Sequence, residues 1–388
     1  MKVTVAPDSL KESLCAVEAA RALARGLRGA CNGVGVECVP MADGGEGTVD
    51  AMVAATGGRT EQVQVPDPLG RSVCARFGLW DGARRAVVEM AAASGLALLT
   101  AAERDPLRAS TRGTGALVRA ALDAGADRII VGLGGSATVD GGAGMAAELG
   151  ARFLGENGTV IEQPRGADLE RIRRVDISGL DARLAGARIV AACDVTNPLL
   201  GPEGAARVYA PQKGADPKAV ERLERGMQNY STVLARDTGR EVAGLPGAGA
   251  AGGLGAGLAA LLGAELRSGV ETVMEAARLR ERMDGSAFAL TAEGRVDGQS
   301  AFGKVPAGVA RLGAELGVPV IVLGGALGPG WEKLLASNGG GAAAVLPICD
   351  GPMTREQAFE RAGALLQQAA ASVLRLWCAA CGGAKHDG

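Results

Sequence analysis

Four loops of the chain combine glycines with reactive side chains, and each follows a short apolar run that predicts a β-strand. They span residues 6–13, 42–48, 133–144 and 292–299. A turn needs only Gly, Asn, Asp or Ser, but these loops also carry lysine, arginine and several carboxylates. Such groups can hold an anionic substrate, ligate a metal ion or accept a proton. Because ligands of parallel α/β sheets bind where the strands end, we expect these loops to carry the functional residues.

The loop at 133–144 is the richest in glycine, and a helix is predicted directly after it over 144–149. Exposed backbone N–H groups and the positive end of a helix together attract anions. The pattern therefore fits a phosphate or nucleotide site, with a tight structural turn as an equal alternative.

Three further positions have both a functional and a structural interpretation. Residues 298–305 match GxxxxGK, but Val305 stands where a P-loop has the hydroxyl that ligates Mg²⁺, so the P-loop hypothesis is rejected. Lys304 then either contacts an anion or is simply solvated. Asp194 ends a predicted strand and either faces a ligand or caps the next turn. Arg71 either binds a ligand or forms a surface ion pair of little energetic value.

Composition excludes several classes of function. The 388 residues carry 41 Lys+Arg against 43 Asp+Glu, without a clustered basic face, so we expect no nucleic-acid partner. The single histidine, His386, excludes Ser-His-Asp triads and histidine metal sites from the core. The Trp-Cys-Ala-Ala-Cys run at 377–381 ends a predicted helix, whereas redox motifs begin one. The uncharged segment 242–264 has too many glycines for a membrane span, and no signal segment is evident, so we expect a cytoplasmic protein without a membrane partner.

The hydrophobic pattern predicts an α/β protein of two domains. Apolar runs predict strands at 3–6, 36–41, 287–291, 320–323 and 343–348, and amphipathic stretches predict helices at 16–27, 305–316, 331–337 and 355–377. Their alternation indicates a five-stranded parallel sheet covered on both faces, built from residues 1–64 and 286–380. The intervening residues 65–285 are predicted to form an inserted α/β domain with strands at 86–90, 128–131 and 188–192, and 381–388 a disordered tail.

Nine motifs in this order resemble the bacterial glycerate kinase family, over Met1 to about Leu376. They lie at residues 6–14, 42–48, 66–71, 110–115, 132–145, 194–199, 211–215, 246–255 and 293–297. The chain departs from the family pattern at Arg112, Val139 and Ala292, none of which removes a charged group that the family has. The resemblance implies a flavodoxin-like domain with a second α/β domain inserted in it.

The resemblance also implies a reaction. This is the phosphorylation of D-glycerate by ATP with Mg²⁺, on the 2-hydroxyl to give 2-phosphoglycerate, in the cleft between the two domains. The 3-hydroxyl stays open as the alternative acceptor, as does a homodimer as the assembly. A dinucleotide-dependent oxidoreductase and a non-catalytic small-molecule sensor are weaker hypotheses, since Gly132 to Ala137 fit a dinucleotide fingerprint only loosely.

The same resemblance suggests roles for individual residues. Glycerate or the transferred phosphoryl group would be bound by Lys11 and Arg295, helped by Arg71 and Lys304. Mg²⁺ binding and acceptance of the hydroxyl proton would fall to Asp194, Glu293 and Asp297. The acceptor pocket would be completed by Asp8, Ser9, Asp43 and Glu46. The phosphates of the nucleotide would lie on Gly134, Gly135, Ser136, Asp140, Gly141 and Gly142.

Overall fold

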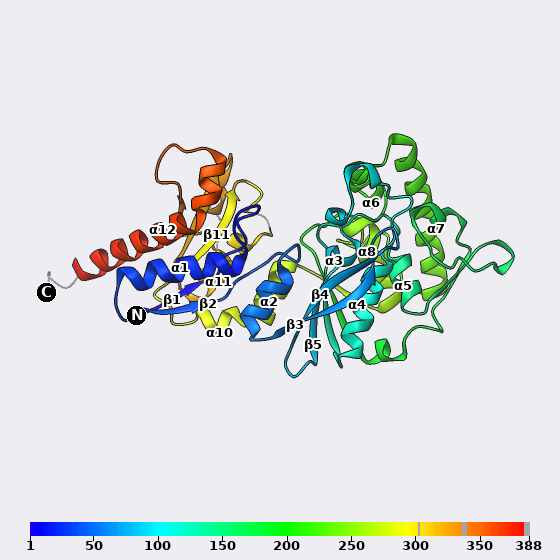
Figure 1. Cartoon of the computed structure of the whole chain (residues 1–388), viewed down its shortest axis with the longest axis horizontal. Coiled ribbons are helices and arrows are strands. Elements are labelled where there is room, and N and C mark those ends of the chain that lie inside the picture. The colour runs from blue at the N-terminus through cyan, green and yellow to red at the C-terminus, as the bar shows by residue number, and fades with distance from the viewer. Residues whose placement is uncertain (302, 336–339, 384–388) are drawn as a thin grey trace. The chain divides into compact units, whose positions relative to one another are not determined.

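The structure is a computed structural model and describes residues 1–301, 303–335 and 340–383. The chain divides into two compact units (Figure 1). Unit 1 comprises Met1–Asp43, Asp50–Gly57 and the chain from Val270 onward, and unit 2 comprises Gly44–Val49 and Gly58–Gly269.

The domain boundaries differ from those expected at 64/65 and 285/286. Residues 59–64 belong to unit 2, because β3 (Arg59–Pro66) pairs antiparallel with β4 (Ser72–Trp80) along its whole length. Residues 270–285 belong to unit 1, because Arg282 in α10 (Leu279–Met283) binds Glu37 and donates to the carbonyls of Cys38 and Ala55.

Unit 1 is built on a parallel five-stranded sheet in the order β13-β12-β11-β1-β2. The strands are β1 (Lys2–Val5), β2 (Gly35–Cys38), β11 (Phe288–Val296), β12 (Val320–Leu327) and β13 (Ala344–Pro347). Numbered by their order within this sheet, the strands run 2-1-3-4-5, the flavodoxin-like arrangement. The predicted fold class is therefore confirmed.

Helices cover both faces of this sheet, as the alternation of side chains along its strands requires. The helices are α1 (Ala16–Ala30), α2 (Thr48–Thr56), α9 (Gly269–Ala276), α10, α11 (Val305–Leu316) and α12 (Arg355–Gly383). Val3, Val5 and Leu290 pack with α1 and α12 on one face. The intervening residue Thr4 bonds to Arg282 of α10 on the other face.

The C-terminal helix α12 is longer than expected. It runs to Gly383, so residues 381–383 of the expected tail are helical, while 384–388 lie outside the described residues. Among the described residues, 355–381 form the one helix long and apolar enough to cross a membrane. Leu365, Leu366 and Leu374 of this helix are buried in the core of unit 1, where the helix packs against α1. The helix expected at 331–337 is a short 3₁₀ turn, η7 (Trp331–Leu334), and 336–337 lie outside the described residues.

Unit 2 contains a mixed six-stranded sheet in the order β10-β9-β6-β5-β4-β3. Its parallel strands are β5 (Arg85–Glu89), β6 (Arg128–Gly132), β9 (Arg188–Ala192) and β10 (Glu265–Arg267), and β3 and β4 extend it antiparallel. A separate pair joins β7 (Arg152–Leu154) to β8 (Arg174–Asp176). The helices are α3 (Ala91–Ser94), α4 (Arg112–Asp123), α5 (Ala143–Glu148), α6 (Ala205–Tyr209), α7 (Pro217–Thr238) and α8 (Ala250–Leu262). Short 3₁₀ turns lie at Leu96–Leu98, Ala101–Glu103, Glu156–Gly158, Gly166–Arg171, Ala182–Gly186 and Pro211–Lys213.

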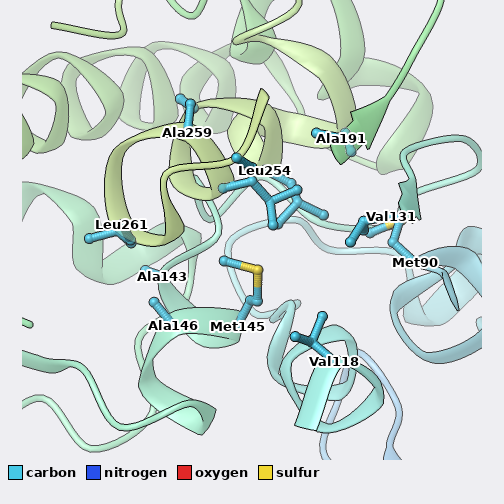
Figure 2. Packing of buried hydrophobic residues seen from close by; sticks show 14 of the residues in the cluster. Met90, Val118, Val131, Ala143, Met145, Ala146, Ala191, Leu254, Ala259 and Leu261 are labelled. Atoms are coloured by element: carbon cyan, nitrogen blue, oxygen red, sulfur yellow. The ribbon is translucent and has the colours of Figure 1, made fainter. Parts of the chain in front are cut away.

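The core of unit 2 surrounds the glycine-rich helix α8. Figure 2 shows Leu254 of this helix close to Met145 and Val131, and Leu261 on the side of Ala143. A Cβ atom at Gly252 would come within 1.9 Å of the Thr138 carbonyl oxygen. The glycines of the uncharged segment therefore allow close backbone contact in a protein core, where residues 250–261 of the helix are buried.

Candidate active site

The carboxyl ends of β1, β2 and β11 gather acidic side chains in unit 1. Asp8 follows β1, and its N–H donates to the Ala292 carbonyl of β11 at 2.9 Å. Glu293 is the next residue of β11, and Asp43 comes from the loop after β2. β1 lies between β2 and β11 in one parallel sheet (Figure 1), and the charges of Asp43 and Glu293 both act on Asp8, so the three carboxylates lie close to one another.

The surroundings of Asp8 raise its pKa. Asp8 is 7% exposed, and burial raises its pKa to about 7, with further raising by Asp43 and Glu293. The Ser9 N–H, which donates to Asp8 Oδ1 at 2.6 Å, and the charge of Lys11 work in the opposite direction. A carboxylate with a pKa near neutrality can accept a proton and return it at physiological pH.

Glu293 is held by two side chains from the segment that follows β11. Ser300 Oγ donates to its Oε2 at 2.6 Å, and Lys304 Nζ donates to its Oε1 at 3.0 Å. Burial lowers the pKa of Lys304, but the ion pair with Glu293 and the nearby Asp297 and Asp43 outweigh it and raise the pKa overall. Lys304 therefore carries its charge inside an acidic cluster and is not simply solvated.

The remaining predicted residues of unit 1 lie at the rim of this cluster. Lys11 is exposed, and its backbone passes close to β11, since a Cβ at Gly294 would meet Lys11 N at 3.1 Å. Arg295 lies 3.3 Å from Asp297 in an ion pair and is 65% exposed. Two cationic side chains thus stand beside the enclosed carboxylates, where an anionic substrate would need them.

The glycine-rich loop after β6 lies in unit 2, and Asp140 holds it in place. Asp140 is fully buried and accepts hydrogen bonds from the N–H and hydroxyl of Thr111 at 2.8 Å and from the N–H groups of Gly142 and Gly144. Gly141 and Gly142 adopt φ of 62° and 76°, which other residues rarely adopt. Since all described contacts of Asp140 are internal, the side chain anchors the loop to the start of α4. Its predicted role as a nucleotide contact stays a prediction.

Sequence reasoning missed one residue beside this loop, Lys213. It is 2% exposed and donates to Ser136 Oγ at 2.6 Å and to the Thr138 carbonyl at 2.8 Å. The signal was the position of Lys213 in the 211–215 motif, to which no role was attached. A lysine is rarely buried, so composition and pattern offered no reason to place it inside.

Three other predicted residues also lie in unit 2. Asp194 Oδ1 accepts from the Ser268 hydroxyl at 2.8 Å and from the Gly269 N–H at 2.9 Å. Arg71 forms ion pairs with Asp67 and Glu103, both at 2.6 Å, with half its side chain exposed. Glu46 is exposed.

Comparison with known proteins decides the family. The family model described as the glycerate kinase family matches residues 3–378. The chain belongs to the glycerate kinase family. The predicted resemblance is confirmed, and with it the prediction of an enzyme of this phosphotransferase family.

Individual members of the glycerate kinase family are similar over most of their length. A glycerate kinase of Halalkalibacterium halodurans is 45% identical over 371 residues, 96% of this chain and 97% of that protein. A glycerate 2-kinase of Escherichia coli K12 is 46% identical over 327 residues, 84% of this chain and 86% of that one. The crystal structure of a protein assigned as glycerate kinase 2 from Salmonella typhimurium LT2 matches with a TM-score of 0.89 and 46% identity, over 98% of this chain and 99% of that one.

In this glycerate kinase family member, the predicted site residues fall into two sets. Asp8, Ser9, Lys11, Asp43, Glu293, Arg295, Asp297 and Lys304 lie in unit 1, and the others lie in unit 2. The predicted metal ligands are divided, since Asp194 is in unit 2. Among residues 1–301, 303–335 and 340–383, no three acidic, histidine or cysteine side chains stand close enough to hold a metal ion together.

Proposed function

We propose that this chain transfers the γ-phosphoryl group of ATP to the 2-hydroxyl of D-glycerate. The Escherichia coli relative that is 46% identical is a glycerate 2-kinase, which favours the 2-hydroxyl over the 3-hydroxyl. The observation that carries the proposal is the enclosed Asp8 with Asp43 and Glu293 at the ends of β1, β2 and β11. A hydroxyl that attacks a phosphoryl group loses its proton, and a buried carboxylate such as Asp8, with its raised pKa and with cations beside it, suits that step.

In this proposal unit 1 binds the acceptor. Lys11, Arg295 and Lys304 supply positive charge for the glycerate carboxylate and for the oxygens of the transferred group. Asp8 accepts the hydroxyl proton at one of its carboxylate oxygens. Ser9 and Asp43 line the acceptor side, and Ser9 keeps Asp8 oriented through its N–H.

Unit 2 binds the nucleotide in the same proposal. The phosphates lie against the backbone of Gly134, Gly135 and Ser136, with Gly141 and Gly142 shaping the loop behind them. Glu46 and Arg71 contact the acceptor or the phosphoryl group from this unit. In the case of Arg71 this requires release from at least one of its two acidic partners.

Mg²⁺ fits the oxygen donors that the chain offers. Mg²⁺ in kinases takes one or two protein carboxylates and completes its shell with phosphate oxygens and water, so no cage of three acidic residues is required. Ser300 Oγ accepts from the backbone N–H of Asp297 at 3.2 Å and donates to the Glu293 carboxylate, so it joins the two residues. Glu293 and Asp297 would hold Mg²⁺ in unit 1, where the ion would neutralise charge on the phosphates. Asp194, a residue of unit 2, is a further candidate ligand.

The test is a coupled assay on the purified protein with ATP, Mg²⁺ and D-glycerate. ADP release with a product that enolase consumes directly supports phosphorylation of the 2-hydroxyl. A product that enolase consumes only after a mutase is added means that the 3-hydroxyl is the acceptor. ADP release no greater than in a glycerate-free control contradicts the proposal.

The proposed enzyme works on small molecules in the cytoplasm. Its formal net charge of −2 offers no electrostatic attraction for nucleic acid. Size-exclusion chromatography with light scattering tests whether it forms the homodimer that the sequence leaves open, since a monomer has a mass of 38.9 kDa.

A further inference from the structure

A buried lysine stands behind the glycine-rich loop of unit 2. Lys213 ends the 3₁₀ turn η6 (Pro211–Lys213), and its ammonium nitrogen reaches both Ser136 and Thr138. Only 2% of the residue is exposed, so the charge has been removed from water almost completely. An apolar side chain of similar volume would fill this position at a lower free energy, because burial of a charge is unfavourable unless strong contacts offset it.

The need to neutralise the charge of Asp140 does not explain why Lys213 is buried at this position. Asp140 already accepts four hydrogen bonds from Thr111, Gly142 and Gly144. Both described hydrogen bonds of Lys213 are made to the loop at 136–138 instead. The contact of Lys213 with Ser136 Oγ therefore fixes the position of the Ser136 side chain and the direction of its hydroxyl proton.

The tip of this loop presents donors without acceptors. Gly135 is exposed and has φ of 72°, a left-handed conformation of the kind found where successive N–H groups turn toward an anion. Within the described part of the chain, no protein acceptor bonds to the N–H groups of Gly135 and Ser136, whereas the Gly135 carbonyl and the Ala137 N–H pair with Leu96 and Ser94. The backbone on both sides is thus fixed, while these two adjacent N–H groups have no acceptor within the described residues.

We propose that Lys213 is a positioning residue for nucleotide binding, whose ammonium donates to Ser136 Oγ so that the Ser136 hydroxyl donates its own proton to a phosphate oxygen of ATP. The inference deepens the proposed function, since it rests on ATP as the ligand of unit 2. A hydroxyl oxygen that accepts from an ammonium cannot direct its own proton toward that ammonium. Ser136 Oγ–H then joins the N–H groups of Gly135 and Ser136 as a third donor to the phosphate.

The inference implies a dependence on pH. Burial lowers the pKa of Lys213 to about 7, and the charge of Asp140 opposes that shift. Tyr230 of α7 packs against Gly141 and keeps its proton, because burial raises its pKa well above 10. Above about pH 7 Lys213 loses its charge, and its lone pair can then accept the Ser136 proton. The hydroxyl turns inward, and the phosphate loses a donor.

The experiment measures MgATP binding by titration calorimetry from pH 6.5 to 9, on the full chain without glycerate. The variants are Ser136→Ala, Ser136→Thr, Lys213→Met and the double variant Ser136→Ala/Lys213→Met. Lys218→Met is the matched control, because Lys218 is an exposed lysine at the start of α7. We expect Ser136→Ala and Lys213→Met each to weaken binding about tenfold at pH 6.5, the size of one charge-assisted hydrogen bond.

The expected pattern distinguishes positioning from simple support of the fold. The double variant should bind no more weakly than either single variant, Ser136→Thr should retain binding, and wild-type binding should weaken about tenfold toward pH 9. Ser136→Ala should lose most of that pH dependence. The nucleotide itself titrates equally in both experiments, so the difference between the wild-type and Ser136→Ala profiles does not contain that contribution. If Lys213→Met does not fold, Ser136→Ala and Ser136→Thr carry the test alone.

Two results would overturn the inference. One is unchanged affinity in Ser136→Ala, and the other is losses that multiply to about a hundredfold in the double variant. A wild-type chain that binds MgATP with this pattern but does not phosphorylate glycerate contradicts the proposed function and leaves the inference standing.

Discussion

Asp8 is a buried carboxylate with a raised pKa, so we predict that replacing this proposed catalytic residue by Asn makes the folded chain more stable. Asp8→Asn replaces an anion that burial, Asp43 and Glu293 all disfavour. The Asn carbonyl oxygen can still accept the Ser9 N–H, which Asp8 Oδ1 accepts at 2.6 Å. The substitution therefore removes the unfavourable charge and keeps the local hydrogen bond.

The magnitude follows from the shift of the pKa from 3.8 to about 7. The folded state holds the Asp8 proton more tightly than the unfolded state, so wild-type stability falls as pH rises from 3.8 to about 7 and stays reduced above it. A shift of roughly 3 pKa units corresponds to about 4 kcal/mol, which is an upper value because the cluster relaxes. At pH 8 Asp8→Asn should gain up to that amount, and at pH 5 less than half of it.

The assay is urea denaturation at pH 5 and pH 8 in EDTA, without nucleotide or glycerate. Asp176→Asn is the control, because Asp176 also accepts a backbone N–H two residues on, from Ser178, but its pKa is lowered by Ser178. This control should gain nothing at either pH. In the coupled assay Asp8→Asn should lose on the order of 10²-fold or more in kcat/KM. A destabilised Asp8→Asn at pH 8, or an equal gain at both pH values, would refute the electrostatic reasoning.

Three further outcomes are expected. Lys11→Met and Asp297→Asn should each lower kcat/KM by on the order of 10²-fold in steady-state assays with unchanged circular dichroism, and near-wild-type turnover would remove that residue from the site. Gly252→Ala should destabilise unit 2 by on the order of 3 kcal/mol in thermal unfolding. The new Cβ would lie 1.9 Å from the Thr138 carbonyl oxygen, and the backbone at this position has φ of 68°. Gly186→Ala is the control and should not destabilise the unit, because the space around Gly186 is open. Lys213 has a folded pKa of about 7 against 10.5, so the unfolded state binds more protons between these values, and the stability of unit 2 should rise from pH 7 to pH 10. Lys213→Met should abolish that rise in urea denaturation.

The sheet of unit 1 was predictable because its strands are buried. Val320–Leu323 is apolar at every position, which is typical of a strand covered on both faces. In unit 2, β3 was missed because Arg59 and Glu61 occupy the face that Val63 and Val65 continue, which leaves only a short apolar alternation, and several of its residues are exposed in this edge strand. The antiparallel pairing of β3 with β4 shifted the domain boundary, so the error in one edge strand became an error in the extent of both domains.

The residue types of the site were predictable, but their protonation was not. Asp8 follows β1 closely and Glu293 lies in the neighbouring parallel strand β11, so a pattern of strands and charges is enough to group the two residues. The pKa of Asp8 depends on burial by side chains that are distant in sequence. The burial of Lys213 depends in the same way on a loop 75 residues earlier in the chain, so the sequence pattern did not reveal it. Asp8 and Lys213 both titrate at about pH 7 because burial acts on opposite charges in opposite directions. A pH profile of activity would therefore contain a rising limb from Asp8 as a base and a falling limb from Lys213 as a cation. The two limbs separate in Asp8→Asn and Ser136→Ala, because each variant removes one and leaves the other.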